Sequence, residues 1–424
     1  MTTTTSTETA GYRTYVLVLL ILIYAFNFLD RQIVGILAGP IMAELKLNKS
    51  EMGLMGGIAF AALYSTLALP IAWLADRKSR VWIMTAALTL WSGFTVACGF
   101  ANSFWSMFAM RMGVGVGEAG GVAPAYSLIA DYFPPKQRAR ALAAFSFGIP
   151  LGMALGILLG GLLAAYIDWR WAFISVGLAG LVLAPIFRLT VRDPVRGGLD
   201  PAPLADKADV PPFSEVCRTL LPKRSFWLLA FAAACSSVCG YGVAFWLPTL
   251  FMQSLGLTLT ETSWYYSGIV FFGGIAGIWL GGVLADRMGA ADRGAYARVP
   301  AYAYLIALPF FFLALNSPSL LLAFPLFLVP TALNLVWLGP VVTAVQHLVA
   351  PSMRATASAM FLLVNNLVGI GLGTYYFGLM ADLLEPQFGT EAMKYAIYSG
   401  GVFYVLAALL MFLASRTLKQ DWRE

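Results

Sequence analysis

The chain consists mainly of long apolar runs separated by short polar segments. A helix needs about 17 to 25 apolar residues to cross the hydrocarbon core of a bilayer. Twelve runs have this character, at residues 14–42, 51–75, 81–103, 105–131, 141–166, 171–190, 225–252, 262–285, 299–315, 319–347, 355–384 and 394–415. They are continuously apolar, whereas barrel strands alternate apolar and polar residues. The pattern therefore predicts an all-α integral membrane protein with twelve transmembrane helices.

One long hydrophilic stretch, Val191 to Lys223, divides the runs into two sets of six. Each set contains a Leu-Ala-Asp-Arg loop, at 74–77 and 284–287, and a Pro-x-x-Arg-Ala-x-Ala segment, at 135–141 and 351–357. The offsets of 210 and 216 residues indicate one duplication. We expect two pseudo-symmetric six-helix bundles, at 1–190 and 224–424, joined by a cytoplasmic linker at 191–223. Matching loops on one membrane side imply parallel repeats around an axis along the membrane normal.

The charge distribution reports topology rather than a nucleic-acid partner. Only 11% of the residues are charged and the net charge is +6. If the N-terminus is cytoplasmic, most of the 27 Lys and Arg residues fall on the cytoplasmic side, and the exceptions outside are Lys46, Lys49, Arg170 and Lys394. We therefore expect both termini in the cytoplasm and, from the short loops and compact linker, a bacterial inner membrane.

Charged side chains deep in the predicted spans are Asp30, Arg31, Arg111 and Glu118. A charge at the bilayer centre costs about 2.5 to 3.5 kcal/mol on insertion scales, so such residues are functional candidates. Counting about 1.5 Å per residue places Asp30 and Glu118 at one level near the midplane. We interpret the two carboxylates as proton-coupling groups, and Arg31 or Arg111 as the contact for an anionic substrate. The alternative is a neutral quartet that only fixes one helix against another; the pairing within it is left open.

Small residues recur every fourth position in two spans, at Gly113, Gly117 and Gly121 and at Gly152, Gly156 and Gly160. This spacing predicts close helix packing. The second set of runs carries no deep charge. It offers an aromatic and amide surface, formed by Tyr241, Trp246, Tyr265, Tyr266, Asn334, Trp337, Asn365 and Asn366. We expect Tyr241, Trp246, Asn365 and Asn366, with Asn27 of the first run, to contact an amphipathic substrate; the aromatics could equally face lipid.

Several motifs resemble the major facilitator superfamily. The two loops are similar to its signature Gly-x-Leu-Ala-Asp-Arg-x-Gly-Arg: Gly282 and Gly289 match it in the second half, and Ala72 and Ser79 replace those glycines in the first, which keeps Arg80. The Arg-x-x-x-Gly segment at 111–115 and Trp-Arg-Trp-Ala-Phe at 169–173 also fit. The resemblance implies the major facilitator fold. It also implies that the loop residues gate the cytoplasmic side, namely Asp76, Arg77, Arg80, Asp286 and Arg287; the alternative is charge that only sets topology.

Shorter segments resemble the spinster-like branch, which moves lysolipids and sphingoid phosphates. They are Asn-Phe-Leu-Asp-Arg at 27–31, Gly-Glu-Ala at 117–119 and Phe-Gly-Ile-Pro-Leu-Gly at 147–152. The first two also occur in the anion:cation symporter branch, which moves small organic anions. The resemblance therefore implies a proton-coupled transporter of lysophospholipids or sphingoid phosphates, and the alternative is a symporter of small organic carboxylates.

Other function classes are less compatible with the residues. No Gly-x-x-x-x-Gly-Lys-[Ser/Thr] segment is present, so ATP is not the direct energy source. A membrane enzyme would need a nucleophile, a metal cluster or an acid-base set near the interface, and Cys235 and Cys239 have no second pair to complete a metal site. We therefore expect a transporter that is not an enzyme, works as a monomer, and needs no metal, cofactor or nucleic acid. Its partners are the bilayer, protons and an amphipathic anion. A sensor or scaffold stays open.

Overall fold

The computed structural model describes residues 9–422 except 197–198, 200–212, 290–291 and 351–352; the side chains of Ala139, Ala285, Asp286 and Ala355 also lie outside the described part. The described residues form helices and short connections, with no β-strand among them. The first bundle consists of α1 (Ala10–Ile36), α2 (Ala38–Leu45), α3 (Lys49–Gly56), α4 (Ile58–Ala75), α5 (Arg80–Cys98), α6 (Phe104–Glu118), α7 (Val122–Tyr132), α8 (Pro135–Ser146), α9 (Gly148–Tyr166) and α10 (Trp169–Thr190).

The second bundle is formed by α12 (Arg224–Ser254), α13 (Leu259–Gly289), α14 (Ala295–Leu315), α15 (Leu320–Leu335), α16 (Leu338–Gln346), α17 (Arg354–Phe388), η3 (Gly389–Glu391), α18 (Ala392–Ser399) and α19 (Gly401–Asp421). A short amphipathic helix, α11 (Phe213–Leu220), lies in the predicted linker and buries Val216 and Leu220.

The twelve predicted runs correspond to twelve helical columns within the described part of the chain. A column here is one helix, or two consecutive helical segments, that runs from one end of the bundle to the other. Ten described stretches are long and apolar enough to cross a membrane. One of them, Thr356–Asp421, contains two columns, α17 and the pair α18–α19. The remaining column, α6–α7, falls short because it is interrupted after Glu118. The prediction of an all-α fold with twelve membrane-spanning helices is confirmed.

Several columns are divided into two helical segments, and proline explains most of the divisions. The third residue of the later segment is Pro40 in α2, Pro124 in α7, Pro150 in α9 and Pro340 in α16. Proline has no N–H to donate to the carbonyl four residues earlier, and its ring clashes with that carbonyl. The backbone ladder therefore opens just before each proline.

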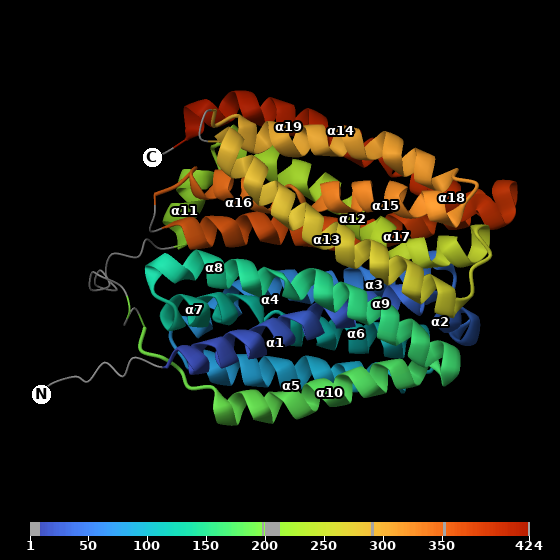
Figure 1. The fold of residues 1–424 in the computed structure, drawn as a ribbon, viewed down its shortest axis with the longest axis horizontal. Helices are drawn as coiled ribbons and strands as arrows, with labels where there is room; N and C mark the ends of the chain where they lie inside the picture. The colour runs from blue at the N-terminus through green and yellow to red at the C-terminus, as the bar shows by residue number, and fades with distance from the viewer. Residues whose placement is uncertain (1–8, 197–198, 200–212, 290–291, 351–352, 423–424) are drawn as a thin grey trace, which may run out of the picture.

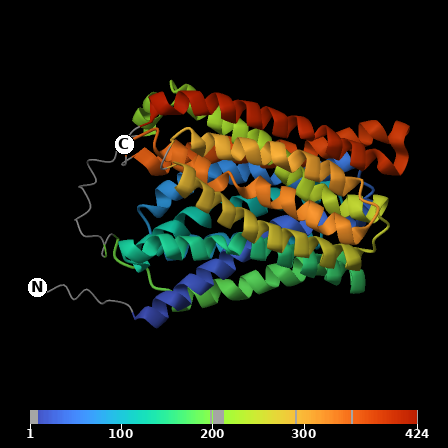
Figure 2. The same cartoon turned by 45° about the horizontal axis from the view of Figure 1, so that its top comes forward.

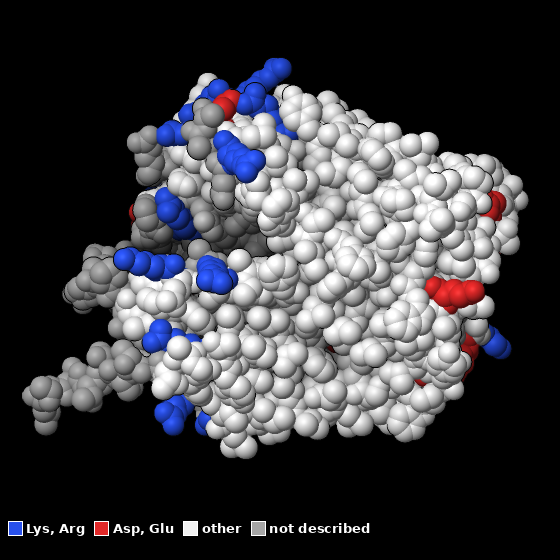
Figure 3. Space-filling model, in the orientation of Figure 1, with Lys and Arg blue, Asp and Glu red and all other residues white. Residues whose placement is uncertain are grey.

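Both termini lie at the same end of the helices, which we call the terminal end; the opposite end, marked by Lys46 and Asn48, is the distal end (Figure 1, Figure 2). On the face seen in Figure 3, Lys and Arg side chains concentrate near the terminal end, a few charged side chains, mostly Asp and Glu, lie at the distal end, and a broad band between the two ends shows no charge. This band fits the hydrocarbon region of a bilayer.

Close helix packing is confirmed along the predicted glycine stripes. A Cβ atom at Gly117 would lie 2.5 Å from the Trp91 backbone nitrogen, which is too close for any side chain. A Cβ atom at Gly156 would lie 2.5 Å from the carbonyl oxygen of Leu29. Glycine at these two positions therefore brings α6 against α5 and α9 against α1.

The two bundles meet mainly through α3 and α4 against α17, α9 against α13, and α1 against α12. Figure 3 shows the surface hollowed between the bundles at the terminal end. At the distal end the bundles are joined by hydrogen bonds and ion pairs, described below. The structure is thus closed between the bundles at the distal end and open at the terminal end.

Candidate substrate and coupling site

The four deep charges predicted from the sequence come together inside the first bundle. Asp30 and Arg31 lie on α1, and Arg111 and Glu118 lie on α6. Exposed fractions are 1% for Asp30, 1% for Arg111 and 0% for Glu118. Neighbouring charges must therefore balance one another, because the surroundings exclude water.

The structure settles the pairing that the sequence left open. Arg31 Nε donates a hydrogen bond of 2.8 Å to Glu118 Oε2. Arg111 Nη1 lies 3.8 Å from Asp30 Oδ1, an ion pair without a hydrogen bond. Thr95 Oγ1, on α5, lies 2.7 Å from Asp30 Oδ2 and 2.9 Å from the carbonyl oxygen of Trp91. Each arginine thus faces one carboxylate.

Many polar atoms of this cluster make no hydrogen bond to the protein. They are Asn27 Oδ1 and Nδ2, Asp30 Oδ1, Arg31 Nη2, Arg111 Nε and Nη1, and Glu118 Oε1. A buried polar group without a partner costs roughly 1 to 3 kcal/mol, and a charged one costs more. A cluster kept only for packing would use these atoms, so their number favours a site that binds water or a ligand.

Aromatic rings surround the guanidinium group of Arg31. Its central carbon lies 5.0 Å from the ring centre of Phe28, 4.8 Å from that of Phe60 and 4.5 Å from that of Tyr64. Cation–π contacts in a desolvated site contribute about 2 kcal/mol or more. The rings therefore hold Arg31 in place while its Nη2 stays without a partner.

Three further tyrosines complete this arrangement, which we call the tyrosine collar: Tyr24, Tyr64, Tyr126 and Tyr241. Their hydroxyls lie close enough to interact electrostatically with one another and, for Tyr24, Tyr64 and Tyr241, with Arg31. Tyr126 is 41% exposed and packs edge-on against Phe145, and its hydroxyl interacts with those of Tyr24 and Tyr64. Sequence reasoning found only Tyr241. The spacing of Tyr24, Phe28 and Arg31 on one helical face was a signal for Tyr24, whereas Tyr64 and Tyr126 lie on other helices and had no such signal.

The remaining residues predicted on the second bundle divide into two groups. Asn365 accepts a hydrogen bond of 2.9 Å from Ser237 and donates one of 3.1 Å to Asn366. These amides therefore bind one another and α12. Trp246 is 0% exposed and donates its indole N–H to the Thr374 carbonyl at 2.8 Å. Its placement corrects the expectation of a substrate contact: in this structure Trp246 packs α12 against α17, because the indole finds its partner within the bundle.

Comparison with known proteins identifies this arrangement. The model of the Major Facilitator Superfamily matches residues 20–374. The chain belongs to the major facilitator superfamily. An MFS-type efflux pump of Mycolicibacterium smegmatis is 31% identical over 404 residues, covering 95% of this chain and 92% of the relative. Protein spinster homolog 1 of Homo sapiens is 30% identical over 409 residues, covering 90% of this chain and 76% of the relative.

A solved structure agrees over the full length. The crystal structure of a bacterial homolog to the human lysosomal transporter Spinster, in inward-facing and unoccupied conformation, matches with a TM-score of 0.88 and 31% identity, covering 98% of this chain and 100% of that chain. The inward-facing and occupied form of that homolog gives 0.83. The predicted spinster-like membership is thus confirmed, and the protein is a multi-pass membrane transporter of the spinster type.

The superfamily's signature loop in the first half fastens the terminal end of the first bundle. Arg80 is 0% exposed and pairs with Asp131 of α7 and with Asp193, whose oxygens accept bonds of 2.7 and 2.9 Å from the Arg80 backbone nitrogen and Nε. Burial alone would raise the pKa of Asp193, but hydrogen bonds from Ser79 and Arg80 and the charge of Arg80 outweigh it and lower the pKa. The loop thus joins α5, α7 and the start of the linker.

Other predicted gating residues make few contacts. Asp76 is exposed, and Arg77 lies 3.9 Å from the ring centre of Trp73 and donates to its carbonyl at 3.1 Å. Arg287 is exposed, and the Asp286 side chain lies outside the described residues. Among the described residues, the groups that Arg77 and Arg80 contact by hydrogen bonds, ion pairs or ring contacts belong to the first bundle or the linker. A lock between the bundles through these loops stays a prediction, for a conformation closed at the terminal end.

The distal end contains a connection between the bundles that the sequence did not suggest. The Asp382 carboxylate, on α17, accepts hydrogen bonds from the backbone nitrogens of Lys49 at 3.2 Å and Ser50 at 2.7 Å, and from the Ser50 hydroxyl at 2.5 Å. Lys49 Nζ lies 2.8 Å from Glu385 Oε2. An acid of the second bundle thus binds the N-terminus of α3, where backbone N–H groups are unpaired and the helix dipole is positive. We call this the distal latch.

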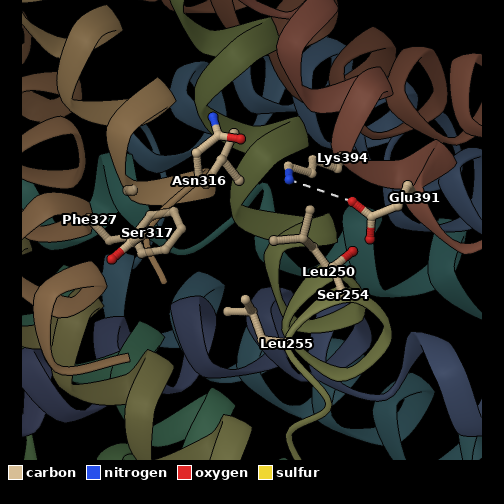
Figure 4. Close-up of a pocket in the computed structure, with 10 residues that line it drawn as sticks. Leu250, Ser254, Leu255, Asn316, Ser317, Phe327, Glu391 and Lys394 are labelled. Carbon is tan, nitrogen blue, oxygen red and sulfur yellow. Dashed lines mark ion pairs between the residues drawn. The ribbon is translucent and has the colours of Figure 1, made fainter. Parts of the chain in front are cut away.

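A separate cavity of about 240 Å³ lies at the distal end within the second bundle (Figure 4). Leu250, Leu255 and Phe327 give it apolar walls, and the paired Glu391 and Lys394, 3.5 Å apart, lie at its edge. Its lining residues belong to the second bundle, whereas the deep charges lie on α1 and α6 of the first, and its own charges, Glu391 and Lys394, are already paired. The cluster of Asp30, Arg31, Arg111 and Glu118 is therefore the candidate transport site.

Proposed function

We propose that this protein is a proton-coupled secondary transporter that moves amphipathic anions, such as lysophospholipids or sphingoid phosphates, by alternating access. The observation that carries the proposal is the Arg31–Glu118 pair beneath the tyrosine collar, in which Arg31 Nη2 and Glu118 Oε1 have no protein partner. Similarity to spinster homologs, one of them a homolog of a lysosomal transporter, supports the same class.

The substrate's charged group would bind Arg31. A phosphate or carboxylate forms strong, often bidentate bonds with a guanidinium group, and Arg31 has one nitrogen without a partner. Tyr126 and Tyr241 add hydroxyl donors near Arg31 and the other tyrosines of the collar. The rings around Arg31, and the second bundle, whose described ion pairs lie toward its ends, suit an apolar tail. A small organic carboxylate would use the first contact and none of the apolar surface, so we favour the amphipath.

Proton coupling would act through the two carboxylates. A protonated Glu118 is neutral, which removes its attraction for Arg31 and leaves the arginine for the substrate's anion. Asp30 has a local partner for either state. When Asp30 is charged, the Thr95 hydroxyl donates to it; when Asp30 is protonated, it donates to Thr95, whose own hydrogen turns to the Trp91 carbonyl. Proton binding and anion binding are thus linked at Arg31.

Alternating access would follow from the two ends of the molecule. We propose that the terminal end is cytoplasmic, because Lys and Arg gather there, and that the protein lies in a bacterial inner membrane with both termini inside. This structure would then be inward-facing. Opening to the outside would require release of the distal latch and closure at the signature loops.

Flux into proteoliposomes tests the proposal. Purified protein is reconstituted, and uptake of a labelled lysophospholipid, a sphingoid phosphate and a sugar acid is followed with and without an imposed pH gradient. We expect gradient-driven flux of the amphipathic anions, lost in Arg31→Ala and no longer responsive to the gradient in Glu118→Gln. Flux of the sugar acid alone would establish the small-anion symporter instead, and product formation without flux would indicate an enzyme.

Glu44→Gln is the matched control. Glu44 is also a carboxylate paired with an arginine, Arg170 at 2.7 Å, but it lies exposed at the distal end. Hydrogen bonds from Arg170 and from Trp169 hold the pKa of Glu44 below its usual value. We expect its flux to stay within about twofold of the unaltered protein, since exposed ion pairs contribute little. An equal loss in Glu44→Gln and Glu118→Gln would refute a specific role for Glu118.

Direction of transport is a separate question. The Mycolicibacterium smegmatis relative is an efflux pump, which favours export of amphipathic compounds. Vesicles are loaded with substrate and contain the Gln137→Cys protein in both orientations. A membrane-impermeant thiol reagent added outside blocks only the molecules whose terminal end faces outward, so the flux that remains distinguishes export from import. If the protein exports its substrate, efflux from the vesicles persists after blocking, because the molecules that carry substrate outward have their terminal end in the lumen.

A further inference from the structure

Two helical columns are interrupted at equivalent places in the duplicated sequence. The α6–α7 column is interrupted at 119–121 and the α15–α16 column at 336–337. Adding the 216-residue offset of the adjacent repeated segments, 135–141 and 351–357, brings the first interruption onto 335–337. The same offset brings Pro124 onto Pro340, so the same chemical cause opens both ladders. Neither Pro40 nor Pro150 has a proline at this offset; residues 256 and 366 are Gly and Asn.

A polar residue in the last turn before each interruption also corresponds. The offset places Glu118 on Asn334, each in the final turn of the segment on the distal side of its interruption. Glu118 binds Arg31 of α1, the first helix of its bundle. Asn334 contacts α12, the first helix of the second bundle: a Cβ atom at Gly240 would lie 2.6 Å from both amide atoms of Asn334.

A second contact ties Asn334 to α19. The Tyr404 hydroxyl donates a hydrogen bond of 3.0 Å to Asn334 Oδ1. Tyr404 is 5% exposed and stacks on Tyr304, with ring centres 5.6 Å apart and planes at 15°. The end of α15 is therefore held against two helices, while α16 begins after an open backbone ladder.

We infer that Asn334 is a positioning residue at a second hinge: held by Tyr404 and against Gly240, it fixes the end of α15 so that α16 pivots at Val336 and Trp337 during transport. Glu118 has the equivalent place in the first bundle, where α7 follows the interruption. The second hinge contains no charge, so proton binding acts on one hinge only. Asn334 acts through the helices that it holds and not through contact with a proton or the substrate. The inference rests on the proposed alternating access, but not on the identity of the substrate.

Two variants disturb Asn334 from different sides. Tyr404→Phe removes one hydrogen bond and keeps the ring, and Gly240→Ala places a methyl group where the amide now lies. Removing one buried hydrogen bond changes an equilibrium about fivefold. We expect Tyr404→Phe to lower turnover about fivefold and leave the apparent affinity for substrate unchanged. If both variants act through Asn334, the double variant shows much less than the product of the two single effects.

Matched controls exist for both changes. Tyr376→Phe removes a similar hydrogen bond of 3.0 Å, to Ser399 at the interruption between α18 and α19, so it tests whether any hydrogen bond beside an interruption has the same effect. Gly93→Ala adds a methyl group to a helix where nothing lies within 4 Å. Both should keep turnover within about twofold. The inference is overturned if Tyr376→Phe slows turnover as much as Tyr404→Phe, if only apparent affinity changes, or if the two hinge variants multiply independently.

A distance measurement decides the matter even if no tested anion is transported. Spin labels at Lys136→Cys on α8 and Thr343→Cys on α16 report the position of α16 by double electron–electron resonance. Cys217 and Cys235 are replaced and the buried Cys98 and Cys239 are kept. We expect Tyr404→Phe to broaden the distribution of distances, and Tyr376→Phe to leave it unchanged. Identical distributions in all three proteins would refute the hinge, whereas failed flux with a broadened distribution would count against the proposed substrate only.

Discussion

The two bundles share a scaffold and differ in chemistry. The first buries two carboxylate–arginine pairs among atoms without partners; the second buries Ser237–Asn365–Asn366 and Asn334–Tyr404, which are neutral and hydrogen-bonded. The ion pairs of the second bundle among the described residues lie toward its ends. Asp382 pairs with Lys49 of the first bundle, and Asp292 pairs with Lys419. Duplication supplied matching helices and matching breaks, and the deep charges occur in one copy only.

The largest expected effect separates a buried charge from a buried amide. In Arg111→Ala, Asp30 loses its opposite charge and stays buried, so we expect the free energy of unfolding to fall by about 3 to 5 kcal/mol. In Asn365→Ala, Ser237 loses one neutral acceptor, at about 1 to 3 kcal/mol. Melting temperatures of the purified proteins in one detergent provide the comparison.

A second variant shows whether charge is the reason. Arg111→Ala combined with Asp30→Asn removes both charges of the pair, so it should recover most of the lost stability while pH-driven flux stays abolished. If Asn365→Ala lowers the melting temperature as far as Arg111→Ala does, or if the double variant recovers nothing, the contrast between the bundles does not rest on charge.

The sequence predicted the scaffold well because its signals are local. Apolar length determines a span, and two repeated motifs determine the halves. The deep charges were also visible, since few residues are as costly inside a membrane. Pairing was not predictable: Arg111 and Glu118 are seven residues apart on α6, and only the tilt and rotation of α1 decide which carboxylate meets which arginine.

Aromatic and latch residues show where sequence reasoning fails. Trp246 and Tyr241 are both aromatics on α12, yet one packs against α17 and the other lies near Arg31. Nothing local distinguishes the two, because both environments suit an indole or phenol ring. Lys49 looked like an exception to the topology rule, and its contacts with Asp382 and Glu385 depend on a helix more than 300 residues away.

An intermediate effect is expected at the distal latch, where the second bundle uses charge without burying it deeply. Asp382→Asn keeps the shape and one acceptor but loses the negative charge at the N-terminus of α3. We expect the distal end to open more often, by about 5 to 30-fold in the equilibrium, which corresponds to about 1 to 2 kcal/mol. Spin labels at Ala43→Cys and Gln387→Cys should show a second, longer distance.

Glu385→Gln is the control for the latch. Glu385 contacts Lys49 through a side chain that is 56% exposed, so its loss should change the distance distribution very little. If Glu385→Gln opens the distal end as far as Asp382→Asn does, the Lys49 ion pair rather than the capped helix holds the bundles together.

The smallest effect concerns pH at the terminal end of the first bundle. Because hydrogen bonds from Ser79 and Arg80 and the Arg80 charge lower the pKa of Asp193 in the folded protein, its contribution to stability is present above the unfolded value of 3.8 and is lost as pH falls below it. Asp193→Asn should therefore lower the melting temperature slightly at pH 7, and this difference should shrink as pH falls below 3.8 toward the lower pKa of the folded protein. Asp168→Asn, at the distal start of α10, is a control in which an acid caps a helix without pairing with Arg80. A difference between Asp193→Asn and the unaltered protein that does not shrink as pH falls would show that shape, and not the carboxylate charge, joins the linker to the first bundle.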